Sequence, residues 1–268
     1  MKFHSGSVGL PILLAVFLLP HWSEPALAQS SWVTRVSRNG IDLYAEFALQ
    51  PAEIWQHTDD VRREVESLLT VKDSTLHVEM VLFSSHRNYL NYLAPRIPDA
   101  QNRRAIFFRN DDVLQVYAFR SRSMITDIRH ELTHAVLHHH LAFLPLWIDE
   151  GLAEYFEEPA AGRNQGTRMA AVRWMARTGW SPSLQNLEAI SAATQMDGDD
   201  YRDSWAWIHF VMHDADAQKL LVDYLQTIRN GEAPGNFSRI LQNRDPDAKN
   251  RLNSYFRRLQ VALPFSNQ

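Results

Sequence analysis

Apolar and polar residues alternate in short runs over the first half of the chain, and this period of two predicts β-strands. The runs cover residues 32–36, 41–47, 76–83, 105–108 and 113–119. Arg38-Asn39-Gly40 separates the first two and is typical of a hairpin turn. Asn110-Asp111-Asp112 separates the last two and predicts a second tight turn.

Elsewhere apolar residues recur every three or four positions, which predicts amphipathic helices. These segments are 51–69, 86–93, 145–156, 201–211, 220–225 and 240–259. Because the strand signals come first and the chain after Ser121 is almost wholly helical, we expect an α+β fold. A small twisted sheet with helices would occupy 29–120, and a mostly helical lobe would occupy 121–268 of the same single domain.

The first 28 residues have the pattern of a secretory signal peptide. Lys2 precedes an apolar stretch at 10–19 that is too short to cross a bilayer, and Ala26-Leu27-Ala28 suits cleavage before Gln29. We therefore expect an exported protein, periplasmic or extracellular, with no stable membrane span after cleavage. An uncleaved anchor is the alternative, and the prolines at the ends of the apolar stretch disfavour it.

Charge and cysteine content narrow the possible partners. Loss of Lys2 and Glu24 with the signal peptide leaves the net charge at -4, which disfavours a nucleic-acid partner. The chain has 0 cysteines, so it has neither disulfides nor thiolate ligands. Any metal ion must be held by nitrogen and oxygen. Nothing in the sequence indicates an oligomeric state.

The stretch His130-Glu131-Leu132-Thr133-His134 is the strongest chemical signal in the chain. Ile125, Ile128 and Val136 supply an apolar stripe around it, which predicts a core-packed helix at the junction of the sheet and the helical lobe. Residues four apart share one face of a helix, so His130 and His134 can bind one Zn²⁺ ion. Glu131 would accept a proton from the water that the metal activates.

Catalytic zinc usually takes three protein ligands, so one more is needed. Glu150 and Glu154 lie four apart on the helix predicted at 145–156 and point to one side. We assign Glu150 to the metal. We expect Glu154 to hold a ligand histidine through the second nitrogen of its ring.

His-Glu-Leu-Thr-His followed by Trp-Ile-Asp-Glu-Gly-Leu-Ala-Glu-Tyr resembles the gluzincin metallopeptidases, the group that includes thermolysin and the zinc aminopeptidases. The likeness covers roughly 126–156 and is greatest to small bacterial proteins of the peptidase MA-like kind. It implies that Glu150 is the third ligand and that Glu154 supports the first histidine. The spacer between His134 and Glu150 is shorter than in the best-known gluzincins. No Gly-x-Met-x-Asn segment precedes the histidine helix, which argues against the zinc aminopeptidases.

A rival ligand set uses His140, which stands where metzincin peptidases have a third histidine. Those enzymes need a glycine at the position of Leu137, and leucine instead favours continuing the helix and carrying His140 away from the other ligands. His138-His139-His140 is typical of a helix C-terminus. A peripheral ligand role for His138 stays open.

A peptidase also needs a group that stabilises the oxyanion and a surface that binds the substrate. Tyr201 is the first candidate donor, with Tyr155 and His209 as alternatives. Strand 113–119, if its edge is free, would bind an extended peptide through main-chain hydrogen bonds.

These patterns favour an exported zinc peptidase that acts on a peptide or protein substrate. Two other classes share the same site: a catalytically silent binding or scaffold protein, and a zinc hydrolase with a non-peptide substrate. Retention of Glu131 favours an active enzyme, because a decayed one would be expected to lose its base before its core.

Overall fold

The computed structural model describes residues 32–110 and 113–259. The predicted signal peptide, 1–28, lies outside the described residues, as do two residues of the second predicted turn, Asp111 and Asp112. Among the described residues no helix combines the length and apolar character needed to cross a membrane.

Five strands form one mixed sheet in the order β1-β2-β3-β5-β4. Their bounds are β1 Thr34–Arg38, β2 Ile41–Ala45, β3 Val78–Phe83, β4 Ala105–Asn110 and β5 Val113–Phe119. β2, β3 and β5 run parallel, while β1 and β4 pair antiparallel at the two edges. The prediction that strand 113–119 has a free edge is therefore wrong, because β5 pairs with β3 on one side and with β4 on the other. Among the described strands, β4 is the edge strand on this side of the sheet.

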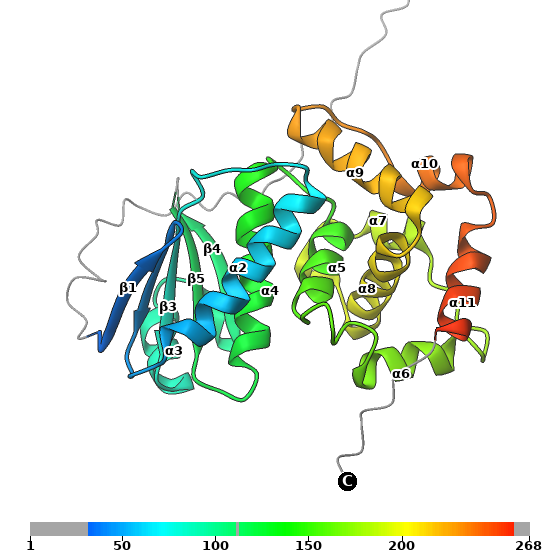
Figure 1. The fold of residues 1–268 in the computed structure, drawn as a ribbon. Helices are drawn as coiled ribbons and strands as arrows, with labels where there is room; N and C mark the ends of the chain where they lie inside the picture. The colour runs from blue at the N-terminus through cyan, green and yellow to red at the C-terminus, as the bar shows by residue number, and fades with distance from the viewer. Residues whose placement is uncertain (1–31, 111–112, 260–268) are drawn as a thin grey trace, which may run out of the picture. The chain divides into compact units, whose positions relative to one another are not determined.

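The helices follow in the order that the periodicity predicts, with several short ones between. They are α2 Pro51–Leu68, α3 His86–Leu93, α4 Met124–His140, α5 Leu146–Phe156, α6 Gly166–Met175, α7 Leu184–Ala189, α8 Gly198–Met212, α9 Ala215–Arg229, α10 Phe237–Arg244 and α11 Ala248–Arg258. Two 3-10 turns, η1 Pro98–Asn102 and η2 Ala193–Gln195, complete the set. This arrangement, sheet first and helices second, confirms the α+β fold (Figure 1).

One face of the sheet is apolar because the strand register aligns buried side chains in rows. Ile41, Val78 and Leu114 are neighbours across three strands, and the next two rows repeat the pattern toward Ala118. α2 and α4 cover this face (Figure 1). The packing against the sheet thereby fixes the orientation of α4 and determines which of its side chains stay outside the core.

The helical part is packed around α5 and α8, which contact each other closely. Gly151 makes this approach possible: a Cβ at this position would lie 2.6 Å from the Ile208 side chain and 2.8 Å from the Ser204 carbonyl oxygen. α5 also contacts α4. The predicted position of the histidine helix, between the sheet and the helical part, is thus the position that α4 occupies.

Candidate metal centre

The two histidines of the motif lie on the face of α4 that α5 approaches, beside the edge strand β4. Ile128, Leu132 and Ala135 are fully buried in the core that α4 shares with the sheet and α2. His130 and His134 lie one turn apart on the side where α5 approaches. The apolar stripe therefore orients the histidines without any metal ion.

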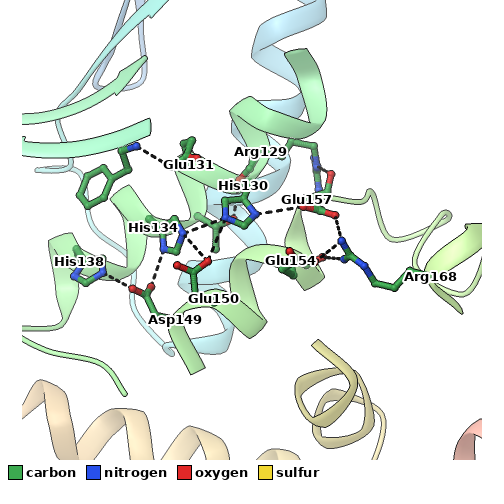
Figure 2. A network of polar contacts seen from close by, with 12 residues as sticks. Arg129, His130, Glu131, His134, His138, Asp149, Glu150, Glu154, Glu157 and Arg168 are labelled. Atoms are coloured by element: carbon green, nitrogen blue, oxygen red, sulfur yellow. Dashed lines mark hydrogen bonds and ion pairs between the residues drawn. The ribbon is translucent and has the colours of Figure 1, made fainter. Parts of the chain in front are cut away.

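Three potential ligand atoms converge between α4 and α5, as Figure 2 shows. The Nε2 atoms of His130 and His134 are 3.3 Å apart. Oε2 of Glu150 lies 3.6 Å from the first and 3.7 Å from the second. We call His130, His134 and Glu150 the triad.

The spacing of these atoms fits a tetrahedral zinc site. Zinc–nitrogen bonds of about 2.05 Å at tetrahedral angles put two ligand atoms about 3.3 Å apart. The observed separations are equal to this value or a few tenths of an ångström longer. Glu150 and His134 are more than nine-tenths buried, which limits competition from solvent. Two imidazole nitrogens and one carboxylate oxygen also form the donor set of many catalytic zinc sites.

Carboxylates hold the outward-facing nitrogens of both histidines. Nδ1 of His134 lies 2.8 Å from Oδ1 of Asp149, and Nδ1 of His130 lies 3.3 Å from Oε2 of Glu157. Burial lowers the pKa of each histidine, but the surrounding carboxylates raise it more, so both pKa values lie above the usual range. Hydrogen bonding at Nδ1 leaves each Nε2 directed toward Glu150.

Glu154 does not have the role that the sequence predicts. Its carboxylate pairs with Arg168, and Glu157, one turn further along, contacts His130 instead. Arg168 also bridges to Glu157, with 3.0 Å between Nη2 and Oε1 (Figure 2). Burial and the neighbouring charge of Glu157 raise the pKa of Glu154 to about 7. The prediction was wrong because α5 ends at Phe156, and the chain beyond it brings Glu157 toward α4.

Glu131 lies beside the triad and is fixed by the edge strand. Its Oε2 accepts a hydrogen bond of 2.7 Å from the backbone N–H of Phe107 in β4. The residue is 8% exposed. β4 therefore lies next to the site and takes the place that strand 113–119 was expected to have.

The three candidate oxyanion donors have different surroundings. Burial raises the pKa of Tyr201, and the charges of Glu150, Glu154 and Glu131 raise it further, so this phenol lies within electrostatic range of the site.

The two alternative donors pack elsewhere. Tyr155 packs its ring under the guanidinium of Arg163. His209 is fully buried and shares a hydrogen bond of 2.9 Å with the Tyr255 hydroxyl. Of the three candidates, Tyr201 is the one whose electrostatic partners belong to the site.

His140 does not join the triad, so the metzincin ligand set is wrong for this chain. α4 continues through His140, as Leu137 predicts, and Nδ1 of His140 lies 3.9 Å from Oδ2 of Asp73. His138 lies nearer the triad, where its Nε2 is 2.8 Å from Oδ2 of Asp149. His138 and His134 thus contact the two oxygens of the same Asp149 carboxylate.

Sequence reasoning missed Asp149 and Glu157 as supports of the ligand histidines. Asp149 directly precedes the predicted third ligand, within the motif region, and Glu157 lies three residues after Glu154, just beyond its end. Spacing alone does not distinguish them from Glu154, because their roles depend on how α5 is placed against α4.

No protein-family model matches this chain, and no curated protein matches it either. The interpretation of the site therefore depends on its own geometry and chemistry.

Proposed function

We propose that the chain is an exported zinc-dependent peptidase of the gluzincin kind, with His130, His134 and Glu150 as metal ligands. The observation that carries the proposal is the convergence of the three ligand atoms at 3.3–3.7 Å beside a buried glutamate. When bound there, zinc would act as a Lewis acid and supply an activated water.

Glu131 is the general base in this proposal. The hydrogen bond from Phe107 N–H occupies Oε2 and fixes the plane of the carboxylate, which leaves Oε1 to accept a proton. The same group would then deliver the proton to the amine that leaves when the peptide bond breaks. A glutamine at this position would keep the shape of the side chain and lose the basic oxygen.

The substrate would bind along the edge strand. Among the described strands β4 pairs with β5 alone, and the hydrogen bond from its Phe107 N–H to Glu131 brings it beside the site. An extended peptide that pairs with this strand would lie across the site and be held through its main chain. Tyr201 would then donate a hydrogen bond to the oxyanion, a contribution that is typically worth about 2.7–4 kcal/mol.

Export rests on the N-terminal sequence. The segment 1–28 has the order of a signal peptide, with Lys2, an apolar stretch and Ala26-Leu27-Ala28. Fractionation of expressing cells would locate the protein, and sequencing its N-terminus would find Gln29 if cleavage occurs as proposed.

The activity is tested with zinc-loaded protein and a library of internally quenched fluorescent peptides. The wild-type protein should cleave some of them, and Glu131→Gln should bind the same amount of zinc and cleave none. Equal cleavage by both proteins would show that Glu131 is not the base. If both proteins bind zinc and neither cleaves a peptide, the result would favour a catalytically silent binding or scaffold protein, or a zinc hydrolase with a non-peptide substrate.

A further inference from the structure

A second group of side chains with potential metal-ligand atoms lies at the C-terminal end of α4. It consists of Asp73, His139 and His140, and we call it the Asp73 cluster. Asp73 belongs to the loop between α2 and β3, which crosses the end of α4 in Figure 1. Two segments distant in sequence therefore bring a carboxylate and two imidazoles together.

The contacts within the Asp73 cluster leave one carboxylate oxygen directed at the histidines. Oδ1 of Asp73 accepts hydrogen bonds from the backbone N–H of Thr75 at 2.6 Å and from its hydroxyl at 2.7 Å. Oδ2 lies 2.7 Å from Nε2 of His139 and 3.9 Å from Nδ1 of His140. The Thr75 hydroxyl also lies 3.4 Å from Nε2 of His139.

His140 is the unusual member, because its buried ring lacks a hydrogen bond. Its side chain is 8% exposed, and among the described residues no group is within hydrogen-bonding distance of its Nε2. Nδ1 faces Oδ2 of Asp73 across 3.9 Å, which is too long for a hydrogen bond. A buried imidazole without partners is unfavourable. A cation between Nδ1 of His140 and Oδ2 of Asp73 would give Nδ1 a partner, since a metal ion can bridge ligand atoms that are too far apart to share a proton. Nε2 points away from Asp73, so only Nδ1 would gain a partner from this ion.

We propose that the Asp73 cluster is a second metal site, which takes a divalent ion of the zinc, nickel or copper class. Two imidazole nitrogens and one carboxylate oxygen favour these ions over calcium and magnesium, which prefer oxygen ligands throughout. The proposal does not depend on peptidase activity or on the triad.

The two sites are separate on α4. His139 lies five residues beyond His134, which is about 7.5 Å along the helix axis and about 140° around it. The side chains of the Asp73 cluster therefore face the α2–β3 loop, while the triad faces α5. One metal ion cannot serve both sites.

A metal ion at the second site would tie the α2–β3 loop to the end of the helix that carries His130 and His134. It would bind more weakly than an ion at the triad, because Asp73 and His139 are each 23% exposed and the 2.7 Å contact must lengthen. Binding should raise the melting temperature, since the ion would stabilise the folded state selectively. The second site would thus stabilise the scaffold of the first.

The test uses the full-length chain with Glu150→Ala, so that a ligand of the triad is removed, and measures zinc binding by equilibrium dialysis. We expect about one zinc ion per chain at saturation and a higher melting temperature with zinc than with magnesium. Adding His139→Ala should weaken zinc binding at least tenfold and abolish the thermal shift. Adding His77→Ala is the matched control, because His77 is an exposed histidine in the same loop and pairs with Asp42 instead of Asp73.

Two results would overturn the proposal. Zinc binding that His139→Ala and His77→Ala affect equally would show that the ion binds elsewhere. No saturable zinc binding by the Glu150→Ala chain, with an unchanged melting temperature, would show that the Asp73 cluster is a hydrogen-bonded ion pair only. His140→Gln provides an independent variant, and circular dichroism shows whether each protein is folded.

Discussion

Asp149 supports a ligand histidine and is not itself a ligand in our account, so its removal should weaken zinc binding without abolishing it. Its carboxylate lies 2.8 Å from Nδ1 of His134 and 2.8 Å from Nε2 of His138. Burial raises the pKa of Asp149, but the two histidines lower it much more, so the group is an anion at neutral pH. Asp149→Ala would leave Nδ1 of His134 without its acceptor.

The expected loss can be bounded from the contacts. Removing a carboxylate behind a ligand histidine typically costs about 10–100-fold in metal affinity, equivalent to about 1.4–2.7 kcal/mol. One of the two Asp149 contacts involves a member of the triad, so one such loss is expected. For Glu157→Ala the loss of zinc affinity should be near tenfold, the lower limit of this range. The contact of Glu157 with His130 is longer, at 3.3 Å, and Glu157 also pairs with Arg168.

Zinc affinity would be measured by competition with a chromophoric chelator at fixed pH. Asp214→Ala is the matched control, since Asp214 is about as buried as Asp149 but caps α9 and pairs with Arg251. An affinity for Asp149→Ala within twofold of wild type would refute the supporting role. Complete loss of zinc, as for removal of a ligand, would place Asp149 in the metal coordination.

Three further predictions concern the oxyanion donor, the packing of α5 and the response to acid. Tyr201→Phe should lower kcat about 100-fold with unchanged zinc content, and an unchanged kcat would exclude the phenol as the donor. Gly151→Ala should destabilise the protein by about 1–3 kcal/mol in urea unfolding, because the new methyl group meets Ile208 and the Ser204 carbonyl; wild-type stability would contradict the close approach of α8. Burial and the charge of His213 lower the pKa of His209 to about 3. Below about pH 6.5 this histidine is therefore protonated in the unfolded chain but stays neutral in the folded chain. Lowering the pH from 7 to 5 should therefore reduce the free energy of unfolding by about 2 kcal/mol through this residue. His209→Gln should remove that part of the slope, and an identical slope in both proteins would show that His209 is not buried as a neutral ring.

The features that could be predicted from sequence depend on local geometry. His130 and His134 share a helix face because they are four residues apart, and the apolar stripe of α4 determines which face is free. Glu150 was found from the ligand count and from its place on a second helix. The α+β fold followed from the change of period from two to between three and four after Ser121.

The features that sequence reasoning got wrong depend on contacts between distant segments. Strand order decides which strand has a free edge, and β4 folds back antiparallel to occupy the edge that β5 was expected to have. Glu157 rather than Glu154 contacts His130 because the chain turns after Phe156, where Arg129 binds the backbone carbonyls of Phe156 and Glu157 at 3.0 Å. The spacing of apolar residues along the sequence predicts local structure and contains no information about contacts between distant segments.

The central claim is tested most directly by the zinc content of the purified protein and two variants, measured by mass spectrometry after dialysis at buffered nanomolar free zinc. The wild-type protein should retain about one zinc ion per chain. Glu150→Ala should retain none, whereas Glu154→Ala should retain most of its zinc. Zinc kept by Glu150→Ala and lost by Glu154→Ala would reverse the ligand assignment, and a wild-type protein without zinc would contradict the metal centre itself.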